Sequence, residues 1–223
     1  MKGRLNIMRK NLMMRLSAFL LVAVLLTTCV ISGTFAKYTT TNEAEDEARV
    51  AQWGVTVTAP SAMFATTYNS NAVKSSNSEK LVAPGTTGTL AAFTITGTPE
   101  VKVDVVYTAS LELAGWVLSD DDNAEEYCPI KFTVGGTAYY IGATINEELI
   151  ENVADLETAV ENAIVAANST YAVGASLAQT LTVSWEWAFS TNAANDVKDT
   201  ELTNNTNLPT ISLEVTCTVN QAA

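Results

Sequence analysis

The residues that could do chemistry in this chain are mostly acids, and they are densest in one short segment. Residues 119–126 read Ser-Asp-Asp-Asp-Asn-Ala-Glu-Glu. Carboxylate oxygens are the ligands that Ca²⁺ prefers. The candidate ligands are Asp120, Asp121, Asp122 and Glu125. The segment departs from the EF-hand pattern, because its sixth position is Glu125 and its twelfth is Lys131. A solvated acidic turn is the alternative, and we expect no cofactor other than Ca²⁺.

Histidine is absent from the whole sequence of 223 residues. This removes the commonest general base and the commonest zinc ligand of proteins. Histidine-assisted serine and cysteine hydrolases are therefore excluded, as are the HExxH proteases. Neighbouring acids such as Glu125 and Glu126 usually point apart and give no sign of paired acid–base catalysis. We predict that the chain is not an enzyme.

Two cysteines and two tryptophans are the remaining candidates for a special role. Cys29 lies in the N-terminal apolar segment, which leaves Cys128 and Cys217. These two either form one disulfide, worth ~4 kcal/mol for so long a loop, or remain as two buried thiols on one inner face. Trp185 and Trp187 would suit sugar stacking if they were exposed. They alternate with polar residues on the side of the strand that carries the other apolar residues, so we predict that both lie in the core.

The N-terminus has the pattern of an export signal. Basic residues precede an apolar run over residues 16–31, and Thr34-Phe35-Ala36 provides small residues at the −3 and −1 positions. We predict that residues 1–36 are a signal peptide, cut by a signal peptidase between Ala36 and Lys37. A retained membrane anchor is the alternative. The protein is then secreted, to the medium or the cell surface, and touches a membrane only through the uncleaved signal.

The charge of the mature chain restricts its partners. Removal of residues 1–36 takes away five basic residues and no acid, which leaves seven basic and 24 acidic residues, a net charge of −17. Such a surface repels phosphate backbones, so we expect no nucleic-acid partner. It favours cations and basic partners instead.

Beyond the signal, the sequence predicts a short arm and one β-rich domain. Residues 37–48 are polar and acidic, which is typical of a mobile arm. Residues 49–223 alternate between apolar and polar residues in several segments, which predicts half-buried strands. The predicted strands cover 51–57, 91–95, 101–113, 128–134, 137–141, 180–189 and 211–219.

One helix is expected to interrupt these strands. Asn146 is its predicted cap, and apolar residues at helical spacing extend it to about residue 167. Gly135-Gly136 predicts a hairpin turn, and residues 191–207 predict a polar connection. The expected fold class is all-β: a two-layer antiparallel β-sandwich of jelly-roll type with one inserted α-helix.

Several stretches together suggest a family. They are Thr34-Phe35-Ala36-Lys37-Tyr38, the acids that follow it, residues 48–55 (ARVAQWGV), Ala83-Pro84-Gly85 and the alternating segment 211–219. In these features the chain resembles the TasA/camelysin-type secreted proteins of Gram-positive bacteria, whose precursors are cut by signal peptidases of the SipW kind.

The resemblance implies a subunit of biofilm-matrix fibres. In that family the N-terminal segment freed by cleavage completes the sheet of the next subunit. Here the donor would be the arm from Lys37 to about Ala48, beginning with Lys37, Tyr38, Thr39, Thr40 and Thr41. Its partners would be further copies of the chain or related matrix proteins. Strand addition of this kind satisfies the backbone groups of an open sheet edge.

Two other functions compete with the fibre. A monomeric surface adhesin or carbohydrate-binding β-sandwich would expose aromatic side chains. Camelysin-type proteins have also been described as metalloproteases, but a chain without histidine does not fit zinc catalysis.

Overall fold

The computed structural model describes most of the chain, in two units that are taken here separately. The described residues are 12–27, 49–58, 62–118, 125–189 and 192–223. In the first unit, Met1–Val50, residues 12–27 form a helix with exposed side chains. Within the described ranges, no helix has the length and hydropathy needed to cross a membrane. The predicted cleavage site Ala36–Lys37 and the arm 37–48 lie outside the described residues.

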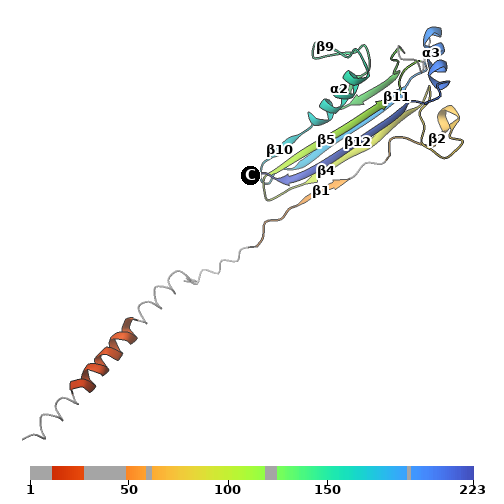
Figure 1. The fold of residues 1–223 in the computed structure, drawn as a ribbon. Coiled ribbons are helices and arrows are strands. Elements are labelled where there is room, and N and C mark those ends of the chain that lie inside the picture. The colour runs from red at the N-terminus through yellow and green to blue at the C-terminus, as the bar shows by residue number, and fades with distance from the viewer. Residues whose placement is uncertain (1–11, 28–48, 59–61, 119–124, 190–191) are drawn as a thin grey trace, which may run out of the picture. The chain divides into compact units, whose positions relative to one another are not determined.

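The second unit, Ala51–Ala223, is mostly β-structure with antiparallel pairing, as the alternating sequence predicts (Figure 1). A five-stranded sheet has the order β1 (Val55–Thr58), β4 (Thr87–Gly97), β11 (Leu177–Trp187), β6 (Ile130–Val134), β7 (Thr137–Tyr139). A three-stranded sheet has the order β10 (Ser169–Tyr171), β5 (Val103–Ala114), β12 (Thr210–Gln221). Two small hairpins, β2 (Thr67–Tyr68) with β3 (Val73–Lys74) and β8 (Thr144–Ile145) with β9 (Glu148–Leu149), complete the strands, and a 3-10 turn, η1 (Asn69–Asn71), separates β2 from β3.

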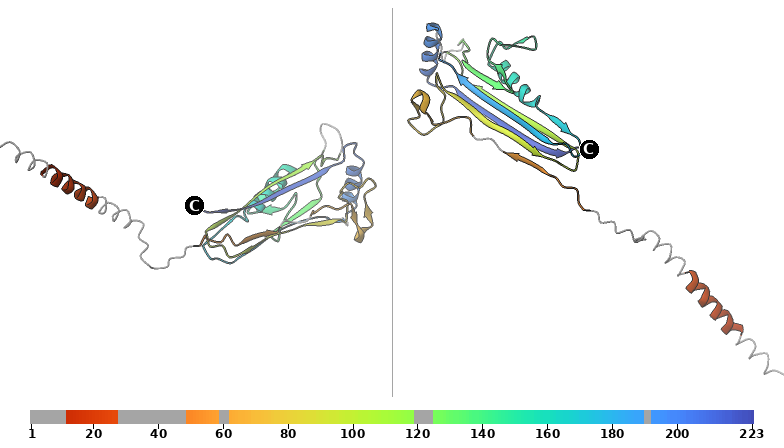
Figure 2. Two further views of the ribbon diagram at one scale, coloured as in Figure 1. Left: turned by 90° about the horizontal axis from the view of Figure 1, so that it is seen from below. Right: turned by 180° about the vertical axis from the view of Figure 1, so that it is seen from behind.

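Residues of both sheets contribute to one hydrophobic core. The view from below draws the two sheets as separate layers (Figure 2). On β5, alternate residues are buried and their neighbours are exposed or half-buried, which is the pattern of a strand with one covered face. Phe93 of β4 meets Tyr107 of β5 edge to face, with ring centroids 6.0 Å apart. Trp185 and Trp187 on β11 are each 2% exposed. The prediction that both tryptophans belong to the core is therefore confirmed.

The turn between β6 and β7 also follows the sequence. Gly135 and Gly136 have φ of +58° and +92°, and the strands on either side pair in antiparallel register. Two consecutive residues with positive φ form the tight hairpin turn whose twist matches that of the strands. Side chains larger than glycine would be strained at both positions.

The main helix begins later than expected. α2 spans Val153–Val165, and its cap is Asn152, whose side-chain oxygen accepts a hydrogen bond from the Asp155 N–H at 2.9 Å. Asn146, the predicted cap, has φ of +51°, and Glu147 has φ of +72°. These two residues form the turn of the β8–β9 hairpin, so a local hairpin replaces the first turns of the predicted helix.

A further helix occupies part of the segment predicted to be a polar connection. α3 spans Ala193–Thr203 and is capped by the Asn192 side chain. Only Leu202 and Asp199 on this helix are buried, so its sequence carries almost no apolar stripe.

The first strand differs as well, because β1 begins at Val55 rather than near Ala51. The side chains of Trp53 and Val57, which were expected to face the core, are each 41% exposed.

Candidate assembly edge

Strand β12 lies at the edge of the three-stranded sheet. It pairs with β5 along its whole length of 12 residues, from Thr210 opposite Ala114 to Gln221 opposite Val103. In the part of the chain that the structure describes, no strand pairs with its other side. The other edge strands of the two large sheets are short: β1 has 4 residues, and β7 and β10 have 3 each. A long edge with unpaired backbone groups is a template for another strand.

The alternation of hydrogen bonds shows which backbone groups face this open side. On β5, the N–H groups of Tyr107, Leu111 and Leu113 donate to side chains on the side away from β12. In an antiparallel pair, the N–H and C=O groups of successive residues point alternately to one side of the strand and to the other. The backbone groups of the even-numbered residues of β5 therefore point to β12 and bond to their even-numbered partners there. The Ala222 N–H donates to the Lys102 carbonyl at 2.9 Å, and this bond also joins two even-numbered residues. The odd-numbered residues of β12 therefore direct their N–H and C=O groups to the open side.

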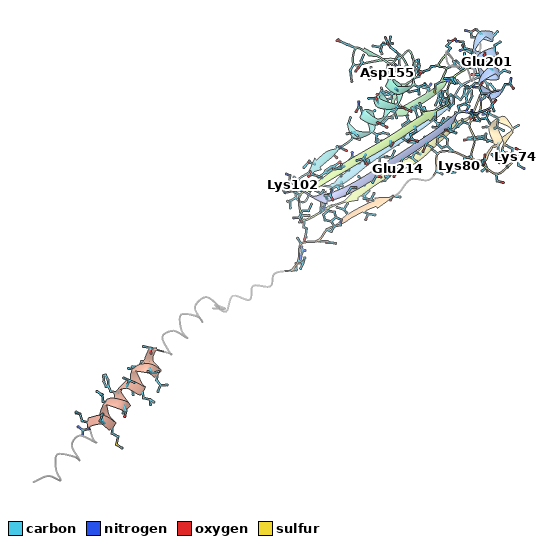
Figure 3. All side chains as sticks on the ribbon, viewed as in Figure 1. Lys74, Lys80, Lys102, Asp155, Glu201 and Glu214 are labelled. Carbon is cyan, nitrogen blue, oxygen red and sulfur yellow. The ribbon has the colours of Figure 1, made fainter. Side chains whose placement is uncertain are left out.

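The same odd-numbered residues carry the apolar side chains of β12. They are Ile211, Leu213, Val215, Cys217 and Val219. All five are only half-buried, whereas their counterparts on the neighbouring strand, such as Val105 and Leu111, are buried. The exposed face of β12 is polar and includes Glu214 (Figure 3). The residues of β12 whose backbone groups are unpaired are thus also those whose apolar side chains are only partly covered.

This open side belongs to one flank of the two sheets. α2 contacts β5, β6 and β7, and it closes the other flank. β12 therefore shares its flank with β4 and β1, and both ribbon views draw α2 and β1 on opposite sides of the sheets (Figures 1 and 2). Here β1 pairs with β4 only opposite Thr94–Gly97, and Trp53 and Val57 remain partly exposed. Apolar surface on this flank is therefore contributed by both sheets.

A buried hydroxyl that has no hydrogen bond of ordinary geometry to the described residues lies beside the same strand. Tyr107, opposite Cys217 in the ladder, is fully buried, and its hydroxyl makes no hydrogen bond of ordinary geometry to any described residue. Burial raises the pKa of Tyr107, and the neighbouring Cys217 thiol raises it further. A buried polar group without a partner costs stability.

The two cysteines of the folded unit are free thiols. Cys128 precedes β6 and is buried, and burial raises the pKa of its thiol to about 12. Cys217 lies within β12 and is half-buried, and burial raises the pKa of its thiol as well. The sequence left two alternatives for these cysteines, one disulfide or two buried thiols. The structure contains two free thiols, of which only Cys128 is fully buried.

Of the four candidate Ca²⁺ ligands in the acidic segment, only Glu125 is among the described residues. Asp120, Asp121 and Asp122 lie outside the described residues. Glu125 is exposed, and its carboxylate pairs with the Lys198 ammonium on α3, with an Oε1–Nζ distance of 2.6 Å. Among the described residues, no group of three or more histidines, cysteines or acids is arranged to hold a metal ion. Ca²⁺ binding by the segment stays a prediction.

A pocket at the end of the sheets is organised by a buried acid that the sequence did not single out. It has a volume of about 380 Å³, and Tyr127, Cys128, Tyr140 and Asp199 contribute to its lining. The Asp199 carboxylate accepts hydrogen bonds from the Tyr127 hydroxyl at 2.8 Å and from the Trp187 indole N–H at 3.3 Å. Burial raises the pKa of Asp199, and its two hydrogen bonds oppose that rise. Because its accepting oxygen is occupied by these groups, the acid attaches α3 to the end of β11.

Comparison with known proteins assigns no family to the chain. No family model, no curated protein and no solved structure matches it. The resemblance to the TasA/camelysin type therefore remains a prediction from the motifs quoted above. The open edge of β12 is the feature of the described structure that points most directly to a function.

Proposed function

We propose that this protein is a secreted structural protein of the cell surface or biofilm matrix, and that it assembles into fibres by strand addition. The two sheets would be the layers of a jelly-roll β-sandwich that lacks one strand beside β12. Residues 37–48 of one copy would supply that strand to the next copy. The role is structural rather than catalytic, which agrees with a sequence that has no histidine.

The open edge of β12 is the observation that carries the proposal. An incoming strand would pair with the odd-numbered residues of β12 and cover their half-buried side chains. Both gains come from one contact, because the residues whose backbone groups point out of the sheet edge are also those whose apolar side chains are only half-buried. Addition of one copy to the next in the same sense produces an open filament rather than a closed ring.

The charge of the chain sets a condition for assembly. Each mature copy carries a net charge of −17, so copies repel one another at low ionic strength. Salt shortens the range of this repulsion to ~10 Å at about 0.1 M. We therefore expect assembly to require salt or a divalent cation.

Electron microscopy of two N-terminal variants tests the proposal. One chain begins at Lys37 and the other at Arg49, and both are imaged with and without millimolar Ca²⁺. We expect filaments from the chain that begins at Lys37 and none from the chain that begins at Arg49. Filaments from both would show that the arm is not the donor.

A chain that remains monomeric in every condition would contradict the fibre. The monomeric adhesin or carbohydrate-binding sandwich would then be the better hypothesis. A glycan-binding screen of the same chain would test it, with Trp53, Tyr140 and Phe189 as the exposed aromatic residues to substitute among those that the structure describes.

A further inference from the structure

The side of β5 that faces away from β12 is covered by the short strand β10 at one end and by side chains further along. β10 pairs with β5 only opposite Val103–Val105. Beyond this point three backbone N–H groups of β5 donate to side-chain oxygens that lie on α2 or just after it. The bonds run from Tyr107 to Asn168 Oδ1 (2.6 Å), from Leu111 to Glu161 Oε1 (2.8 Å) and from Leu113 to Glu157 Oε1 (2.6 Å). A row of side-chain oxygens thus takes the place of the carbonyl groups of a neighbouring strand.

The spacing of this row follows from helix and strand geometry. Four residues of an α-helix rise ~6 Å, and two residues of a strand rise ~6.8 Å. Glu157 and Glu161, one helical turn apart, can therefore meet Leu113 and Leu111, two strand residues apart, when helix and strand run in opposite directions. By the same spacing Val165 comes opposite Ala109 and carries no acceptor, and the row resumes at Asn168.

The oxygens are strong acceptors and are held in place. Hydrogen bonds to ionised carboxylates are stronger than bonds between neutral groups. Leu156, Val160 and Ile164 of α2 are fully buried against the core, which fixes the helix on the sheet. The docked helix therefore keeps the two carboxylates beside the edge of β5.

We propose that α2 is a substitute strand that closes the β5 edge to strand addition, so that within the three-stranded sheet a second copy of this chain can add only at β12. The part that concerns a second copy rests on the proposed function. The closure of β5 by the two carboxylates does not, because it concerns contacts within one copy.

Amide hydrogen exchange on the chain that begins at Arg49 tests the closure without any assembly. We expect Glu157→Ala combined with Glu161→Ala to speed the exchange of the Leu111 and Leu113 amides about ten- to a hundredfold, since each loses a hydrogen bond to a charged group. The Tyr107 amide, bonded to Asn168, keeps its rate. Unprotected Leu111 and Leu113 amides in the native chain, or rates that the alanines do not change, would overturn the proposal.

Control variants separate the hydrogen bonds from general loosening of the helix. Glu157→Gln with Glu161→Gln keeps a weaker, neutral acceptor oxygen at each position and should speed the exchange less than the alanines do. Glu151→Ala removes an exposed glutamate just before α2 and should change neither amide. If the double alanine variant does not fold, the single variants decide: Glu161→Ala should affect Leu111, and Glu157→Ala should affect Leu113. Equal effects of either single variant on both amides would contradict the pairing.

Binding stoichiometry tests the consequence for assembly. A synthetic peptide with the sequence of residues 37–48 is titrated into the chain that begins at Arg49, and heat is measured. We expect one peptide per chain. Two peptides per chain, the second of which changes the exchange rates of the Leu111 and Leu113 amides, would overturn the closure of β5. Absence of binding would contradict the proposed function instead, and the exchange rates would still decide whether α2 closes the edge.

Discussion

Proline substitutions at two neighbouring positions of β12 should have very different costs. Thr216 faces Thr108 in the ladder, and its N–H points to β5. Thr216→Pro removes this donor, leaves the facing carbonyl without its partner and forces φ towards −65° within a paired strand. We expect a loss of about 2 to 4 kcal/mol in the free energy of unfolding, from the lost hydrogen bond and from the carbonyl left without its partner.

Val215→Pro should cost much less. The Val215 N–H points to the open side, where proline is tolerated on edge strands. The side chain is only half-buried, so the change of side chain removes little apolar contact. At ~25 cal/mol per Å² of apolar surface, a loss of a few tens of Å² amounts to about 1 kcal/mol.

Urea unfolding of the chain that begins at Arg49 measures both costs. The slope of free energy against urea concentration should be unchanged, because neither variant alters the surface exposed on unfolding. In the chain that begins at Lys37, Val215→Pro should also prevent filaments while the protein stays folded. Equal losses at the two positions, or a greater loss at Val215, would refute the assignment of odd-numbered residues to an open edge.

Three further results are expected. Because burial raises the pKa of Asp199 above its ordinary 3.8, the folded chain binds this proton more tightly than the unfolded chain, and stability should fall as pH rises above 3.8. Asp199→Asn should flatten this dependence in urea unfolding, and an unchanged slope would argue against it. Alkylation at pH 8 followed by mass spectrometry should modify Cys217 before Cys128, whose buried thiol has a pKa of about 12, and equal rates would be inconsistent with the structure. Tyr107→Phe should stabilise the chain by about 1 kcal/mol in thermal or urea unfolding, because it removes a buried hydroxyl without a partner, and a loss of stability would show that the hydroxyl is bonded.

Strands with one covered face could be predicted from the sequence because their signal is local. The segments that became β5, β11 and β12 alternate with a period of two residues, and this period alone determines which side chains share a face. The Gly135-Gly136 turn was equally local, since both residues need positive φ. The burial of Trp185 and Trp187 follows from the same alternation.

The features that were missed depend on contacts between distant residues or on competing local structures. β11 and β12 show the same alternation of apolar and polar residues, yet β11 pairs with a strand on both sides and β12 with a strand on one side. This difference depends on which strands lie beside each segment and cannot be seen in the sequence of either one. Asn146 and Asn152 are both suitable helix caps, and the hairpin at Asn146 decides between them. α3 has only two buried residues, which is too few to give a helical period.

The row of oxygens on α2 was also beyond sequence reasoning. Glu157 and Glu161 accept hydrogen bonds from β5 instead of lying on an exposed polar face of the helix. Acids at helical spacing usually form an exposed face, and only the position of a strand edge beside the helix gives them another partner.

The distribution of the tryptophans gives the molecule an optical property. Of the four tryptophans in the sequence, Trp116, Trp185 and Trp187 are each 2% exposed, and Trp53 alone is 41% exposed. An indole in water emits at longer wavelength than one in the core, and a soluble quencher reaches it. The red-shifted, quenchable part of the fluorescence therefore comes from Trp53, next to the β1 edge. Any partner that covers that flank would change this emission without a label being attached.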